Sequence, residues 1–75
     1  MKKNKLLSSA LNHLTKALQD LEEDLEQRES AYDNKSEKWQ ESQQGEEFSE
    51  NTQQLEFIKD EIENQITELE ELLND

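Results

Sequence analysis

The sequence predicts an all-α protein: an antiparallel hairpin of two long helices that pack as in a coiled coil. Three observations favour this fold. The 75 residues include no Pro and a single Gly, so little interrupts a helix. Apolar residues recur at steps of three and four in two separate runs. The runs also match each other in reverse order. Residues 1–75 form one domain, too small for a large core of its own.

The first run predicts a helix over about residues 4–32. Its stripe consists of Leu7, Leu11, Leu14, Leu18, Leu21, Leu25 and Tyr32, with Arg28 in the same phase. Ala10, Ala17 and Ala31 each come one residue before a member of this stripe or its phase. Small side chains there allow a second helix to approach closely.

The second run predicts a helix over about residues 46–73. Its stripe consists of Phe48, Leu55, Ile58, Ile62, Ile66, Leu69, Leu72 and Leu73, with Thr52 in the gap. Acids crowd the outer faces of both helices and repel one another at helical spacing. Packing along the stripes must therefore supply the stability.

The two stripes predict the register of the hairpin, because facing residues in an antiparallel pair have numbers with a nearly constant sum. Pairs that add up to 80 are Leu11 with Leu69, Leu14 with Ile66, Leu18 with Ile62, Leu25 with Leu55, Arg28 with Thr52 and Tyr32 with Phe48. Two further pairs, Leu21 with Ile58 and Leu7 with Leu72, add up to 79. The match places the reversal near residue 40. It argues against the alternative, one extended helix that pairs only between chains.

The connection, about residues 33–45, is longer than most loops between bundle helices. Ser36 is a candidate cap for a short helical turn, and Gly45 is expected to reset the backbone before the second helix. Trp39 has two interpretations. It closes the open end of the hairpin over Tyr32 and Phe48, or it projects as an anchor for a binding partner.

Five residues of this region carry a resemblance to a known group. Ser36, Trp39, Ser42 and Gly45, followed by Phe48, form a Ser-x-x-Trp-x-x-Ser-x-x-Gly pattern. The pattern resembles one in small uncharacterised helical proteins of bacteriophages and mobile elements. It covers about a sixth of the chain, and Gln43-Gln44 takes the place of a more charged pair. The resemblance implies an accessory role directed against a host system and assigns no functional residue.

The charge narrows the range of partners. The formal net charge is −12, and residues 17–75 carry all twenty acids against four bases. Such a surface repels nucleic acid and anionic lipid and attracts basic protein surfaces. We expect no direct nucleic-acid binding and no membrane association. Solubility alone is the alternative explanation of the acidity. The lack of Cys and of a signal-peptide core favours the cytoplasm.

The residue types also argue against catalysis. A hydrolytic or metal site needs convergent ligands, whereas this chain has one His, no Cys and carboxylates spread around two helices. His13 lies outside the leucine stripe and is expected at the surface. Asp33, Lys35 and Glu37 do not form a calcium loop, because a lysine stands at a ligand position. We expect no enzyme, no catalytic residue, no cofactor and no metal.

Two functions then compete, both through protein–protein contacts. In the first, the hairpin binds a basic surface and inhibits or decoys a host protein, with imitation of DNA as an extreme form. The candidate residues for this contact are Trp39, Phe57, Glu46, Glu47, Glu50, Glu56, Asp60, Glu61 and Glu63. In the second, the chain is a homo-oligomeric structural or adaptor module. Phe57 and the alanine side then mediate dimerisation into a four-helix bundle.

Overall fold

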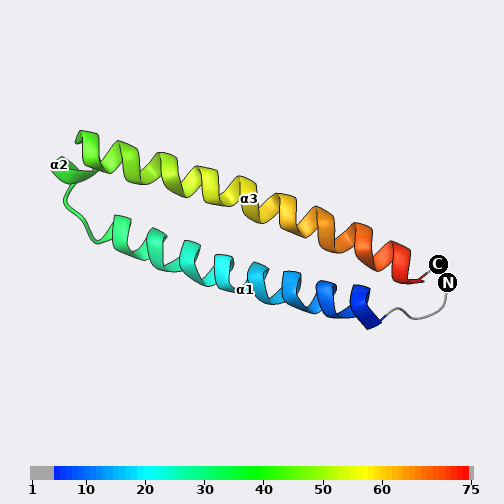
Figure 1. Ribbon diagram of the computed structural model, residues 1–75. Coiled ribbons are helices and arrows are strands. Elements are labelled where there is room, and N and C mark those ends of the chain that lie inside the picture. The colour runs from blue at the N-terminus through cyan, green and yellow to red at the C-terminus, as the bar shows by residue number, and fades with distance from the viewer. Residues whose placement is uncertain (1–4, 75) are drawn as a thin grey trace.

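The computed structural model describes residues 5–74 and contains three helices (Figure 1). They are α1 (Lys5–Asp33), α2 (Glu37–Gln40) and α3 (Gln43–Asn74), and no strand occurs in this range. Helices α1 and α3 lie side by side in opposite directions, and α2 caps the end at which the chain reverses (Figure 1). The molecule is a rod of 57 × 15 × 13 Å. The predicted all-α hairpin is confirmed.

The connection between the two long helices covers residues 34–42, which is shorter than predicted, and it contains the short helix α2. The first helix ends at Asp33, close to its expected end, whereas α3 begins at Gln43, earlier than expected. The short turn between them is capped by Ser36, whose hydroxyl accepts a hydrogen bond from the Trp39 backbone N–H at 3.2 Å. The predicted cap is confirmed.

Gly45 does not reset the backbone, and that prediction was wrong. It lies within the first turns of α3, and no described residue has a positive φ. Gly45 is buried, and a Cβ at this position would meet the carbonyl oxygens of Trp39 and Gln40. The physical reason for glycine here is close packing of α3 against the end of α2.

The apolar contact between the long helices forms a seam of half-buried residues. On α1 it follows the predicted stripe with Arg28 in phase. On α3 it consists of Phe48, Thr52, Leu55, Lys59, Ile62, Ile66, Leu69 and Leu73. This list corrects two expected pairs, because Ile58 and Leu72 are 46% and 50% exposed.

The corrected register has one constant sum along its whole length. Leu21 matches Lys59 and Leu7 matches Leu73, so these pairs also add up to 80. Lys59 can occupy an apolar position because its methylene stem packs inside while the ammonium group reaches the edge of the seam.

The seam is open to water along both edges. Within residues 5–74 no hydrophobic side chain is fully buried. Two helices cover only one side of each apolar stripe, so a single chain leaves part of its stripe area exposed. No helix in this range is both long and apolar enough to cross a membrane.

Candidate functional site: two flanks and an aromatic corner

The two edges of the seam differ in chemistry. On one edge, which we call the acid flank, lie the residues that directly follow every second seam position, counted from Leu7 on α1 and from Phe48 on α3. The acid flank is Ser8, Thr15, Glu22, Glu29, Ser49, Glu56, Glu63 and Glu70. Residues of both helices meet on this edge because the helices are antiparallel, and Glu22 and Glu29 of α1 line a common groove with Glu56 of α3.

The groove of the acid flank lies at the middle of the rod and has a volume of about 420 Å³. Its lining consists of Glu22, Leu25, Glu26, Glu29, Glu56, Lys59 and Asp60. Acids stand on both rims, and the half-buried side chain of Leu25 contributes the apolar part. The groove therefore offers apolar contact between two rows of negative charge.

Lys59 is the cation of this groove. Its side chain is 27% exposed, and its Nζ lies 3.4 Å from Glu63 Oε1 and 4.0 Å from Asp60 Oδ1. The hydrogen bond to Glu63, followed by the charge of that carboxylate, raises the pKa of Lys59 above 10.5. Glu22 on α1 adds to this effect from across the seam. The groove therefore engages its own cation and keeps an excess of acid.

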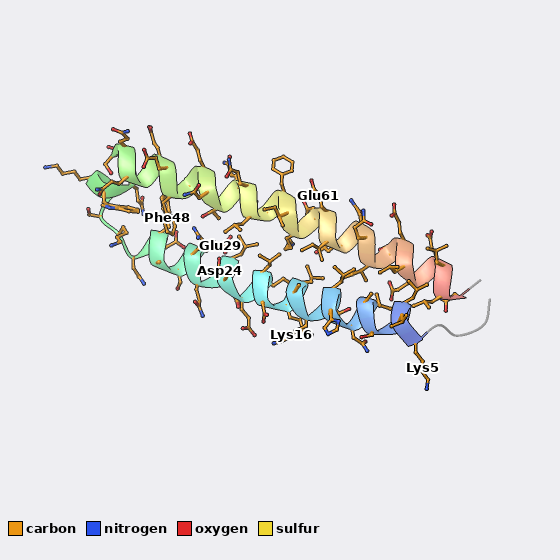
Figure 2. All side chains as sticks on the ribbon, in the orientation of Figure 1. Lys5, Lys16, Asp24, Glu29, Phe48 and Glu61 are labelled. Carbon is orange, nitrogen blue, oxygen red and sulfur yellow. The ribbon has the colours of Figure 1, made fainter. Side chains whose placement is uncertain are left out.

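The acids predicted as partner contacts do not form one surface. Glu56 and Asp60 line the groove, and Glu63 joins them through Lys59. Glu61 projects from α3 on the side away from α1 (Figure 2). The remaining candidates, Glu46, Glu47 and Glu50, are exposed in the first turns of α3.

Sequence reasoning missed Lys59 and the acids of α1. The constant sum of 80 contained the signal for Lys59, because Leu21 requires a partner at position 59. For Glu22 and Glu29, the signal was their place directly after Leu21 and Arg28. An antiparallel register brings those positions to the same edge as Glu56.

The opposite edge, the alanine flank, contains the residues that directly precede the other half of the seam positions, counted from Leu11 on α1 and from Thr52 on α3. The alanine flank is Ala10, Ala17, Asp24, Ala31, Asn51, Ile58, Gln65 and Leu72. Its one acid, Asp24, accepts a hydrogen bond at 2.8 Å from Nε of Arg28 and is thus paired within the chain. The residues of this flank carry a single charge, and it is paired, whereas the acid flank carries five glutamates.

Phe57 belongs to neither flank. Its side chain is 71% exposed, and the shallow depression beside it is lined by Gln53, Glu56 and Asp60, all from α3. The structure therefore separates Phe57 from the alanine side, with which the sequence reading combined it.

Trp39 takes part in an aromatic corner with Tyr32 and Phe48. The ring of Trp39 meets those of Tyr32 and Phe48 edge to face at centroid distances of 6.2 and 5.9 Å. Tyr32 and Phe48 stack at 6.2 Å, and the half-buried Trp39 covers them. Lys35 lies over the Trp39 ring, with Nζ 5.2 Å from the centroid. These contacts agree with the interpretation of Trp39 as a lid, and its role as an anchor for a partner stays a prediction.

The three-residue spacing of the corner sequence has a local explanation. Ser36 caps α2, and the Ser42 hydroxyl donates to the Trp39 carbonyl while accepting from the Gly45 N–H. Gly45 leaves room for the carbonyl of Trp39, and Phe48 stacks in the corner. Each position of the pattern thus has a role in reversing the chain.

Comparison with protein families, curated proteins and solved structures finds no match to this chain. Among the residues that the structure describes, no group of three His, Cys, Asp or Glu side chains is arranged to hold a metal ion.

Proposed function

We propose that the protein is a non-enzymatic hairpin that binds a basic protein surface through its acid flank. The observation that supports this function is the central groove, in which acids from α1 and α3 stand on both sides of the apolar contact at Leu25. A partner with Lys or Arg beside an apolar residue complements such a groove in charge and in shape. The approach of that partner is accelerated by the negative field, and the complex weakens with added salt.

The charge spacing favours a compact basic site over a long DNA-binding cleft. A net charge of −12 on a rod 57 Å long corresponds to about one charge per 5 Å, whereas duplex DNA carries one per about 1.7 Å. We extend the proposal to inhibition or decoy of a host protein in the cytoplasm, as the resemblance of the corner pattern implies. Imitation of DNA is the less favoured form, because the charge density is about a third of that of the duplex.

A pair of matched triple variants tests the location of the site. The first changes Glu22, Glu29 and Glu56 to Gln on the acid flank, and the control changes Glu61, Glu68 and Glu71 to Gln elsewhere. Both variants alter the net charge by the same amount. The probe is a labelled amphipathic helical peptide of Leu and Lys, and its affinity is measured by fluorescence anisotropy at low and high salt. We expect the flank variant to bind at least about tenfold more weakly than the control, since each lost charge pair contributes a fraction of a kcal/mol or more.

Equal weakening in both variants would mean that the peptide senses total charge and that no site exists on the acid flank. Affinity that is indifferent to salt would also count against the proposal. Far-ultraviolet circular dichroism of both variants shows whether the hairpin is still folded.

A second candidate function is that of a self-associating structural or adaptor module. The observation that favours it is the absence of any buried hydrophobic side chain within residues 5–74. Dimerisation into a four-helix bundle covers an apolar edge that a single hairpin exposes. We propose that this association accompanies partner binding rather than replacing it, because the two flanks are separate surfaces.

A further inference from the structure

We infer that the alanine flank is the surface on which a second copy of this chain packs, and that the acid flank stays outside the resulting dimer. This inference rests on the second candidate function and specifies its surface. It also predicts that each dimer carries two acid grooves on opposite sides.

The chemistry of the alanine flank suits close packing of two hairpins. Ala10 and Ala17 are half-buried beside the seam, and a small side chain there allows another helix to approach. Ile58 and Leu72 are large apolar residues with 46% and 50% of their surface exposed. Along this flank, residues that lie across from each other have numbers that add up to 82, which places Ala10 across from Leu72 and Ala17 across from Gln65. Ile58 lies across from Asp24 in the same register. An alanine opposite a larger side chain leaves space into which a side chain of an identical copy, related by a two-fold axis, can insert.

The available area indicates how much of the rod takes part. One long side of 57 × 15 Å has a projected area of roughly 850 Å², close to the roughly 800 Å² per partner of a standard interface. A dimer that overlaps over only half of the rod falls well below this size. The copies therefore align along their full length, which pairs the whole alanine flank of one with that of the other.

Charge decides which flank faces the second copy. Two acid flanks brought together would place Glu22, Glu29 and Glu56 near the equivalent acids of the other copy, with Lys59 already engaged by Glu63. The residues of the alanine flank themselves contribute one acid per copy, and Arg28 neutralises it, whereas Glu68 and Glu71 stand beside Leu72 at its outer edge. Repulsion between like charges thus disfavours the first arrangement and tolerates the second.

The sign of the salt effect follows from the same charges. Each copy has a net charge of −12, and exposed acids such as Glu61 and Glu68 lie outward of the alanine flank on α3. Salt screens the repulsion between the copies, so self-association strengthens as salt is added. Binding of a basic partner weakens under the same change.

Neighbouring residues on α3 provide a matched test of the flank. We expect Ile58→Asp to weaken the dimer by at least about a hundredfold, because it places a charge in the packed surface. Phe57→Asp adds the same charge one residue away, outside the flank, and leaves the dimer within about threefold of the wild-type affinity. Sedimentation velocity over a range of protein concentrations, at low and high salt, measures both. The wild-type chain is expected to change from its monomer mass of 8.9 kDa to twice that value.

A second pair protects the test against misfolding. Ala17→Glu places an acid on the alanine flank, and Thr15→Glu places one on the acid flank of the same helix. We expect the first to dissociate the dimer and the second to keep it, with both retaining helical circular dichroism. Gln65→Leu adds apolar surface to the alanine flank and should tighten the dimer by about tenfold or more.

Three outcomes would overturn the inference: a wild-type monomer at every concentration and salt, dissociation by Phe57→Asp but not by Ile58→Asp, or a dimer that weakens with salt. None of them bears on the acid-flank triple variant, so failure of the dimer surface is distinguishable from failure of the proposed partner site. Peptide binding by the Ile58→Asp monomer with wild-type affinity per chain would support the independence of the two flanks.

Discussion

The corner of the hairpin and its rod are built from the same kinds of helix, yet they differ in how firmly their residues are packed. At the corner three aromatic rings, a buried glycine and two serine side chains interlock between Tyr32 and Phe48. Along the rod every apolar contact is half-open, and a lysine occupies one seam position. The corner therefore specifies the reversal of the chain, while the rod keeps surface available for other molecules.

The tighter packing of the corner has an energetic basis. A loop that reverses the chain must offset the entropy of ordering its residues, and short-range contacts do this at the corner. Gln40 adds one of them, since its Nε2 donates to the carbonyl of Tyr32 at 2.7 Å. The rod gains its stability from many weaker contacts, so single changes there should have smaller effects than single changes at the corner.

The largest loss of stability is expected from Trp39→Ala. Removing the ring opens the aromatic corner over Tyr32 and Phe48 and should lower the free energy of unfolding by about 3 kcal/mol. Trp39→Phe, which keeps an aromatic ring, serves as the control and should cost about 1 kcal/mol. Urea denaturation followed by circular dichroism measures both. Unchanged stability together with lost partner binding would instead identify Trp39 as an interface anchor.

The next largest change in stability is expected from Gly45→Ala. Its sign shows whether helix propensity or close packing against α2 determines the residue at this position. Helix propensity alone predicts a gain of about 1 kcal/mol for this change within a helix. The added Cβ would meet two backbone carbonyl oxygens and lie 2.7 Å from the carbonyl carbon of Gln40. We therefore expect a loss of about 2 kcal/mol. Gln44→Ala, at the exposed neighbouring position, should be nearly neutral, and a gain for Gly45→Ala would show that the corner is loosely packed.

The fold was predictable wherever periodicity determined it. Six facing pairs followed from the spacing of the stripe residues, because a heptad stripe on each helix allows one antiparallel register. Ile58 and Leu72 were misassigned because they are apolar and adjacent to the true seam positions. A pattern that counts apolar residues overlooks the buried stem of Lys59. Gly45 was misread because a glycine required for close packing and one required for a turn look the same in sequence.

The candidate site was predictable only in part. Glu56, Asp60 and Glu63 were selected from the acids of α3, but their distinction from Glu61 depends on which edge of the seam each one occupies. The contribution of Glu22 and Glu29 requires the two helices to be placed together. Charge composition indicated a basic partner, whereas only the register separates an acid flank from an alanine flank.

Loss of the cap at Ser36 should have a moderate effect on the corner. Ser36→Ala removes the acceptor for the Trp39 N–H and should cost about 1 kcal/mol. Ser9→Ala, at an exposed position within α1, is the control and should leave stability unchanged or slightly higher. Thermal unfolding of the two variants measures this effect. If the aromatic rings alone held the turn, both variants would melt like the wild type.

A substitution of Lys59 in the seam should change the stability of the hairpin only slightly, and it should raise the stability where the substitutions at the corner lower it. Lys59→Leu fills the position facing Leu21 with an apolar side chain, and we expect the midpoint of thermal unfolding to rise. Lys16→Leu is the matched control, because Lys16 also pairs with an acid four residues later, Asp20 at 3.1 Å, but is 70% exposed. It should produce no such rise. Equal effects of the two changes would show that position 59 is not part of the seam.

The stability gained by Lys59→Leu should depend on pH. The hydrogen bond and charge of Glu63 raise the pKa of Lys59 in the folded chain above its ordinary value of 10.5. A raised pKa means that the ion pair contributes fully below pH 10.5 and is lost as the pH rises through the folded pKa. The wild-type chain loses this contribution in alkaline solution, whereas Lys59→Leu never had it. Asp20 also raises the pKa of Lys16, but Lys16 is present in both chains, so it does not contribute to the difference in stability between them. The advantage of Lys59→Leu should therefore grow above pH 10.5 in urea titrations, and a constant advantage across this range would show that the Lys59 pair adds nothing to the rod.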